Sequence, residues 1–178
     1  AVAVGLLVVA RSARGRRAPV TAEPAPDLPV ATEHRPFAAV VANPTKVDDA
    51  DVRLDWVRQA SEDLGWAPPL WLETTREDIG AGQARAAVEA GAAVVLAYGG
   101  DGTVRAVASA LSGTKTPLGL LPLGTGNLLA RNLGIGVTDL AEALRTGLSW
   151  SERKVDVGVV EFDLSGEDHT PRRETFLV

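Results

Sequence analysis

A glycine-rich stretch, AVVLAYGGDGT at residues 93–103, contains the residues of this sequence best suited to chemistry. Gly99, Gly100 and Gly102 remove side chains where the backbone must turn and where a ligand must approach it closely. A short apolar run precedes these glycines, and apolar residues at helical spacing follow them. Unpaired N–H groups at a helix start attract anions, so this strand, turn and helix predict a phosphate site.

Asp101, in the middle of this loop, argues against a merely structural glycine turn. A carboxylate would repel a bare phosphate unless a divalent cation or a proton-donating hydroxyl lies between the two groups. The loop therefore favours chemistry on a magnesium-bound nucleotide. Its spacing excludes a Rossmann fingerprint, because Arg105 stands where a glycine is needed, and the sequence contains no GxxxxGK[ST] motif.

The elements that must position this loop follow from the hydrophobic pattern. Alternation of short apolar runs with helical spacing predicts a three-layer α/β/α domain built on a parallel sheet. In such a fold, ligands bind at the carboxyl ends of the strands. Strands are expected over 37–42, 70–75, 94–96 and 118–123, and helices over 49–64, 79–90, 104–111, 124–133 and 140–144.

The predicted strand ends share one chemical character, since each is followed by small polar residues or glycines. The sequences are NPTK at 43–46, TT at 74–75, GGDGT at 99–103 and PLGTGN at 122–127. Taken singly, these are turn and cap residues. Because parallel strands end at one edge of a sheet, together they favour a nucleotide site, where threonine hydroxyls can donate to phosphate oxygens.

Composition excludes several further classes of protein and of binding site. The chain has 178 residues, no cysteine and a formal net charge of −5. This length suits one domain or a little more, and the missing cysteines exclude disulfides and thiolate metal sites. The acidic balance argues against a nucleic-acid partner. Methionine is absent even at position 1, so we interpret the sequence as a piece of a longer chain.

The first 36 residues differ from the rest. Residues 1–10 are continuously apolar and arginines follow within 11–17, a pattern we interpret as the end of a transmembrane helix with a basic flank. The positive-inside rule then predicts a membrane-associated protein whose globular part lies on the cytoplasmic side. A core strand or a signal-peptide segment is the alternative. Prolines mark residues 18–36 as a linker, and the globular domain begins near Phe37.

Four motifs in order, NPT, GGDGT, PLGTGN and KVDVG at 154–158, resemble the catalytic domain of the diacylglycerol kinase family of lipid kinases. That group includes sphingosine kinases and is more distantly similar to NAD kinases. The resemblance covers residues 37–178. It implies an α/β nucleotide-binding domain over 37–149 and the beginning of a truncated β-rich second domain over 150–178, with ATP, Mg²⁺ and a lipid hydroxyl meeting between the two domains.

The resemblance also implies roles for individual residues. Asp101 would lie at the phosphates or the metal, and Asp156 would be the acidic residue of the KVD motif, which makes both catalytic candidates and Asp101 the metal candidate. The implied activity transfers the γ-phosphate of ATP to a lipid alcohol, diacylglycerol above all, at a membrane. The resemblance leaves open whether the protein forms a homodimer. The expected ATP contacts are Asn43, Pro44, Thr45, Lys46, Thr75, Gly99, Gly100, Asp101, Gly102, Thr103, Gly124, Thr125 and Asn127.

The sequence departs from the family pattern in ways that keep alternatives open. Arg105-Ala106 stands where many relatives have Asn-Glu, and Leu128 stands where many have Asp. The family's catalytic carboxylate lies in the second domain, so the fragment alone is expected to be inactive. An NAD kinase-like enzyme and a non-catalytic, membrane-tethered nucleotide-binding protein are the alternatives. We also expect Gly102→Val to damage both binding and folding.

Overall fold

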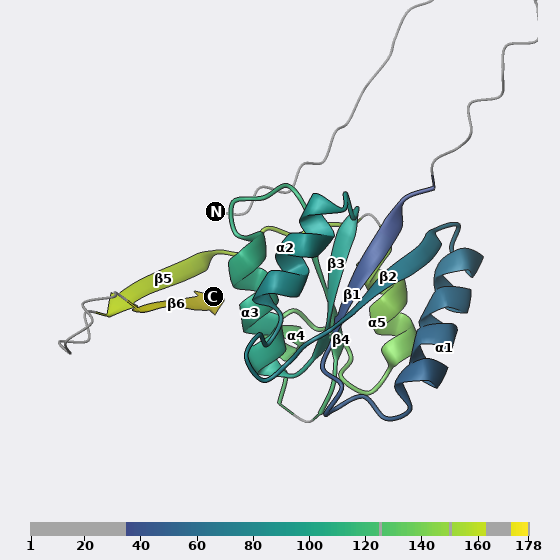
Figure 1. Cartoon of the computed structure of the whole chain (residues 1–178), viewed down its shortest axis with the longest axis horizontal. Helices are drawn as coiled ribbons and strands as arrows, with labels where there is room; N and C mark the ends of the chain where they lie inside the picture. Colours follow the sequence, from purple (N-terminus) through teal and green to yellow (C-terminus); the bar gives the residue numbers. More distant parts are fainter. Residues whose placement is uncertain (1–34, 125, 150, 163–171, 178) are drawn as a thin grey trace, which may run out of the picture.

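The computed structural model describes residues 35–124, 126–149, 151–162 and 172–177. Its main sheet is parallel, and the strands lie in the order β2-β1-β3-β4 (Figure 1). The strands of this sheet are β1 (Phe37–Ala42), β2 (Ala67–Glu73), β3 (Val94–Gly99) and β4 (Leu118–Pro122). The helices are α1 (Ala50–Asp63), α2 (Ala81–Glu89), α3 (Asp101–Leu111), α4 (Leu128–Asn132) and α5 (Leu140–Gly147).

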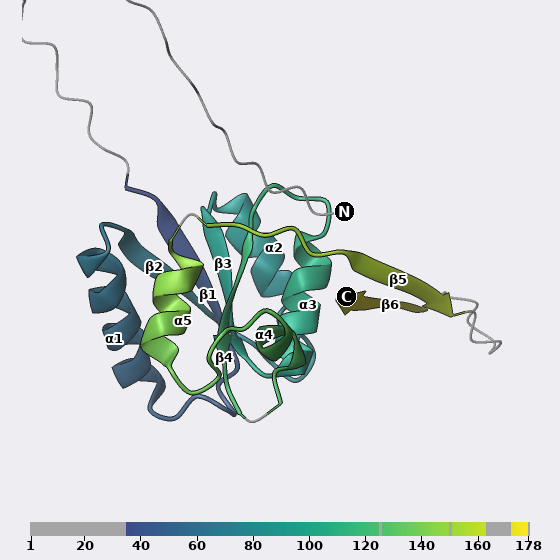
Figure 2. The same ribbon diagram turned by 180° about the vertical axis from the view of Figure 1, so that it is seen from behind.

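Helices cover both faces of the sheet, which confirms the three-layer α/β/α expectation. Helices α2, α3 and α4 pack on one face, and α1 and α5 pack on the other (Figures 1 and 2). Strand β3 is buried along its whole length. Leu96 belongs to the core cluster under α1 and α5, whereas its neighbour Val95 belongs to the cluster under α2 and α3. This two-sided burial explains why the strand reads as a continuous apolar run.

Strand β2 begins earlier than the sequence suggested, at Ala67 instead of Leu70. Pro68 and Pro69 argue against a strand because proline lacks an N–H group. Because β2 is an edge strand of the sheet, it can accept prolines. The pairing with β1 shifts register between Phe37 and Ala39, beside the prolines.

Helix α4 is shorter than predicted, and the expectation of a helix from residue 124 is wrong at its start. Gly124 has a φ of 84° and Asn127 a φ of 48°, both in the left-handed region. A right-handed helix cannot include such residues, so α4 begins only at Leu128. The loop before α4 therefore belongs to the carboxyl end of β4.

Strands β5 (Val157–Phe162) and β6 (Arg172–Leu177) form an antiparallel hairpin that projects beside α3 (Figures 1 and 2). A two-stranded hairpin is marginally stable by itself, so it depends on neighbouring structure. Within the described ranges, no helix combines the length and the hydrophobicity that crossing a bilayer requires. The predicted transmembrane segment at 1–17 and almost all of the linker lie outside those ranges.

Candidate nucleotide-binding site

The carboxyl ends of the strands meet at one edge of the sheet, as the sequence predicted. The N–H of Asn43, after β1, donates to the carbonyl of Tyr98 in β3 over 3.0 Å. The N–H of Leu123, after β4, donates to the carbonyl of Gly99 over 3.0 Å. These bonds place the NPTK, GGDGT and PLGTGN segments side by side.

A small cavity of about 110 Å³ opens between the NPTK and GGDGT segments. The exposed Lys46 brings a positive charge to it, and its Nζ lies over Gly100, only 2.5 Å from where a Cβ at that position would be. Helix α3 begins here, and the first N–H groups of a helix have no partner within it. An ammonium group and a helix start fit a phosphate. The cavity is lined by Asn43, Lys46, Ile79, Gly100, Gly102 and Thr103.

Asn43 and Thr45 shape the first loop through a local turn. The Oδ1 of Asn43 accepts from the N–H of Thr45 over 3.0 Å and from its hydroxyl over 2.7 Å. The hydroxyl hydrogen of Thr45 is therefore engaged within the loop. Among the residues described, Asn43 and Lys46 line the cavity, whereas Pro44 and Thr45 do not.

Thr75 shapes a second turn, between β2 and α2. Its hydroxyl accepts from the N–H of Asp78 over 3.0 Å, and its own N–H donates to the Asp78 carbonyl over 2.8 Å. The Asp78 carboxylate then accepts from Gly80 and Gly82 at the start of α2. This turn presents Ile79 to the cavity, while Thr75 itself is not among the lining residues.

The glycines of the GGDGT segment at 99–103, which we call the central loop, have different structural tasks. A Cβ at Gly99 would lie 2.7 Å from Oγ1 of the buried Thr103, so close packing requires glycine there. A Cβ at Gly102 would meet nothing within 4 Å, and the φ of Gly102 is not left-handed. The fold therefore has room for a side chain at position 102, and the expectation that Gly102→Val damages folding is not supported.

The carboxylate of Asp101 faces the loop before α4. Its Oδ2 accepts from the N–H of Asn127 over 3.0 Å, and its Oδ1 accepts from the N–H of Leu128 over 2.7 Å. Gly126 makes room for it, because a Cβ at Gly126 would lie 2.8 Å from Oδ2. Asp101 does not line the cavity, although Gly100 and Gly102 on either side of it do.

Asn127 is buried, and its side chain holds the two loops together. Its Nδ2 donates to the carbonyl of Gly99 over 2.8 Å and to that of Leu123 over 3.4 Å. Its Oδ1 has no hydrogen-bond partner among the described residues. Gly124 begins this loop in a left-handed conformation, and Thr125 lies outside the described residues.

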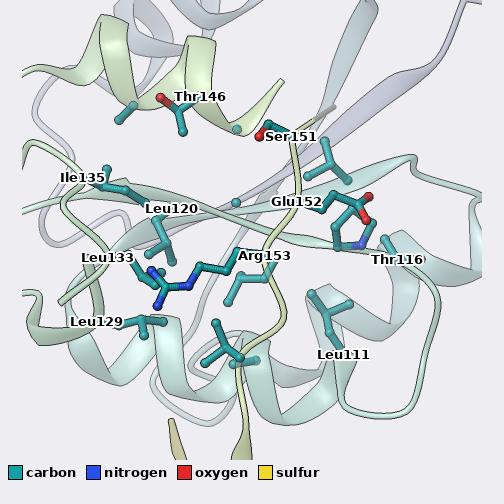
Figure 3. Close-up of a pocket in the computed structure, with 18 of the residues that line it drawn as sticks. Leu111, Thr116, Leu120, Leu129, Leu133, Ile135, Thr146, Ser151, Glu152 and Arg153 are labelled. Atoms are coloured by element: carbon teal, nitrogen blue, oxygen red, sulfur yellow. The ribbon is translucent and has the colours of Figure 1, made fainter. Parts of the chain in front are cut away.

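Asp156, the other catalytic candidate, is exposed just before β5 and does not line the small cavity. Its neighbours Val155 and Val157 line a larger groove of about 300 Å³ along β4. Figure 3 shows Arg153 extending across this groove toward Leu129 and Leu133. The role of Asp156 stays a prediction.

Sequence reasoning missed two residues that shape the site. Ile79 lines the cavity, but its sequence neighbourhood indicates only a helix start. Gly126 lies against Asp101, and the PLGTGN motif contained it without indicating that contact. Only the fold brings residue 126 to residue 101.

The titratable groups of the site give no preassembled metal centre. Among the described residues, no group of three or more His, Cys, Asp or Glu side chains could hold an ion. Burial raises the pKa of the Tyr98 hydroxyl above its ordinary value; the nearby Arg53 opposes this effect and Asp48 adds to it. Tyr98 therefore stays neutral at physiological pH and serves the core.

Known proteins resemble this chain in sequence. The family pattern described as "Diacylglycerol kinase catalytic domain" matches residues 38–160. A "Probable lipid kinase YegS-like" of Chromohalobacter salexigens is 46% identical over 84 residues, which are 45% of this chain and 27% of that protein. A "Diacylglycerol kinase" of Bacillus subtilis is 38% identical over 69 residues, which are 38% of this chain and 23% of that protein.

Solved structures show the same fold. A diacylglycerol kinase structure from Bacillus anthracis superposes with a TM-score of 0.57 at 21% sequence identity, covering 73% of this chain and 44% of that one. A second, putative diacylglycerol kinase structure from the same organism gives a TM-score of 0.55 at 22% identity, covering 73% of this chain and 47% of that one. The chain thus matches less than half the length of these relatives.

Proposed function

We propose that this chain, which belongs to the diacylglycerol kinase catalytic-domain family, forms the nucleotide-binding part of a lipid kinase. The membership rests on the family match over residues 38–160, well over half of the chain. The single observation that carries the nucleotide role is the cavity where Lys46 lies over Gly100 at the start of α3. That arrangement supports binding of a phosphate chain.

The proposed reaction transfers the γ-phosphate of ATP to a lipid hydroxyl, with diacylglycerol converted to phosphatidic acid. Phosphoryl transfer needs mainly positioning and neutralisation of charge that spreads over the phosphate oxygens. Lys46 and the first N–H groups of α3 would supply both to the nucleotide. The alcohol must lose its proton to a base. Asp156 and carboxylates of a further domain are the candidates.

Mg²⁺ would neutralise phosphate charge when bound with the nucleotide. Among the described residues, no cluster of three His, Cys, Asp or Glu side chains could hold the ion by itself. Asp101 is the sequence-predicted protein ligand, and its two oxygens already accept backbone hydrogen bonds. Such a carboxylate keeps lone pairs for an ion but is not free to turn toward it.

The substrate class also motivates a proposal about location. A lipid alcohol resides in a bilayer, and an enzyme anchored there meets it at high effective concentration. We propose that residues 1–17 anchor the protein and that the catalytic domain works on the cytoplasmic side. The apolar run followed by arginines supports this proposal.

A transfer assay on the intact protein that contains this chain tests the activity. ATP labelled at its γ-phosphate is offered with diacylglycerol, a sphingoid base or NAD, in lipid–detergent micelles with and without Mg²⁺. Magnesium-dependent label in phosphatidic acid is the expected result. Label in NADP would indicate an NAD kinase-like enzyme instead, and ATP binding without transfer to any acceptor would indicate a non-catalytic protein.

Two lysine variants test the site itself. Lys46→Gln should weaken ATP binding about tenfold, because it removes the charge at the cavity, while the melting temperature stays within about 1 °C of wild type. Lys115→Gln is the matched control, since Lys115 is exposed on the turn after α3 and does not line the cavity. Equal ATP affinities for wild type and both variants would contradict the proposed site.

A further inference from the structure

Asp101 and residues 126–128 form a connection between the central loop and the loop before α4, which we call the loop tether. We infer that Asp101 is a positioning residue. Its carboxylate holds the loop before α4, called the second loop below, in the shape that nucleotide binding requires. This inference rests on the proposed nucleotide function. It assigns Asp101 a task that does not require the side chain to contact either the metal or the phosphates.

The geometry of the loop tether is specific for a carboxylate. Each oxygen of Asp101 has its own donor, with Oδ2 accepting from Asn127 and Oδ1 from Leu128, over 3.0 and 2.7 Å. The two donors lie 26 and 27 residues away in the chain. An asparagine in the same position has a single acceptor oxygen, and its NH₂ group would face the second N–H, donor against donor.

The surrounding residues are adapted to this contact. Gly126 has no side chain at the point where a Cβ would lie 2.8 Å from Oδ2. Asn127 adopts a left-handed conformation, which an asparagine tolerates but which costs energy. The Asp101 carboxylate and the two carbonyls that accept from Asn127 hold it there. Removing Asp101 would leave the first N–H groups of α4 without their acceptor.

The loop tether also explains why an acidic residue can lie in a phosphate loop. Charge-assisted hydrogen bonds to two N–H groups spread the negative charge of Asp101 over the second loop. The carboxylate then faces this loop while Gly100 and Gly102 face the cavity. The electrostatic cost of the carboxylate to a nearby phosphate is thereby lowered.

Nucleotide binding without metal separates positioning from metal ligation. The intact protein is compared with Asp101→Asn, and the ATP dissociation constant is measured in EDTA and in Mg²⁺. Positioning predicts about tenfold weaker binding in both conditions, because the second loop loses its shape. A residue that acts only as a metal ligand predicts weaker binding in Mg²⁺ alone, and unchanged or tighter binding in EDTA, where a negative charge has been removed from beside the phosphates.

Asp139→Asn is the matched control. Asp139 caps α5 by accepting from the N–H of Glu142 over 2.9 Å, and it does not line the cavity. In nucleotide-free and metal-free buffer, Asp101→Asn should melt about 3 to 8 °C below wild type, because one of its two N–H donors loses its acceptor. Asp139→Asn should melt within about 1 °C of wild type, because asparagine caps a helix as well as aspartate does. Only Asp101→Asn should change ATP affinity. An unchanged melting temperature for Asp101→Asn would overturn the loop tether.

Gly126→Ala is the second variant, and it keeps the inference testable if Asp101→Asn does not fold. It preserves the carboxylate but displaces it from the loop, so positioning again predicts weaker ATP binding in EDTA. Wild-type affinity in EDTA for this variant would overturn the inference. Failure of the wild-type protein to bind ATP in either condition would instead overturn the proposed function, a result distinct from both.

Discussion

Asn127 donates its side-chain amide to the carbonyl of Gly99 over 2.8 Å, across 28 residues of sequence. Gly99 ends β3, and Asn127 precedes α4. The same carbonyl accepts from the N–H of Leu123. The end of β3 therefore holds the beginning and the end of the loop that follows β4, and Asn127 lies inside the protein where a ligand contact had been expected.

Replacement of Asn127 should therefore act first on the stability of the fold, not on the binding of a ligand. We expect Asn127→Ala to reduce the free energy of unfolding by about 1–3 kcal/mol, because buried hydrogen bonds are lost and alanine tolerates the left-handed conformation less well. Urea unfolding of the nucleotide-free protein measures this. Asn132→Ala, at an exposed position in α4, is the control and should unfold like wild type. Equal stabilities of the two variants would contradict the buried role of Asn127.

Gly99→Ala should destabilise the fold. Its new Cβ would lie 2.7 Å from Oγ1 and 2.8 Å from Cβ of Thr103, and both partners are buried at the junction of β3 and α3. We expect a loss of about 1–3 kcal/mol, as for other overpacked cores. Thermal unfolding of Gly99→Ala alone and combined with Thr103→Ala tests the cause. The combined variant should recover part of the loss, because alanine lacks both the Oγ1 that lies 2.7 Å and the methyl group that lies 3.2 Å from the added Cβ.

Gly102→Ala should leave the fold stable but weaken ATP binding. No atom lies within 4 Å of the added methyl group, so the free energy of unfolding should change by less than about 1 kcal/mol. Because Gly102 lines the cavity, we expect ATP binding to weaken about threefold to tenfold, and Gly102→Val should weaken it further. Calorimetric titration with ATP is the measurement. Unfolding of either variant at ambient temperature would restore the expectation drawn from sequence.

Tyr98 should make stability depend on pH in alkaline solution. Burial raises the pKa of its hydroxyl in the folded state, while the unfolded chain titrates near the ordinary value of about 10. The unfolded state therefore releases its proton first, and stability is lost as the pH rises above about 10. Urea unfolding at neutral pH and near pH 11 should show a smaller alkaline loss for Tyr98→Phe than for wild type. Identical pH profiles would contradict this contribution.

The sequence by itself determined the architecture, because hydrophobic periodicity depends on local geometry. The fully buried β3 reads as a continuous apolar run, and the stripe of Val104, Val107 and Leu111 marks the core face of α3. The order of strands and helices then implies that the loops collect at one sheet edge. The predicted boundaries of elements are wrong where the tertiary structure overrides a local preference. Pro68 and Pro69 are an example, because they lie in an edge strand that accepts prolines.

The tasks of individual polar residues were decided only by the tertiary structure. Sequence reasoning named Asp101, Asn127 and Thr75 as ligand contacts because their chemistry suits a nucleotide. The structure shows each of these side chains hydrogen-bonded to backbone groups. The groups bonded to Asp101, and the Gly99 carbonyl bonded to Asn127, lie more than 20 residues away in the chain. A carboxylate or an amide has the same chemistry toward a backbone N–H as toward a ligand. Which of them it meets depends on the distance between loops, and only the folded chain sets that distance.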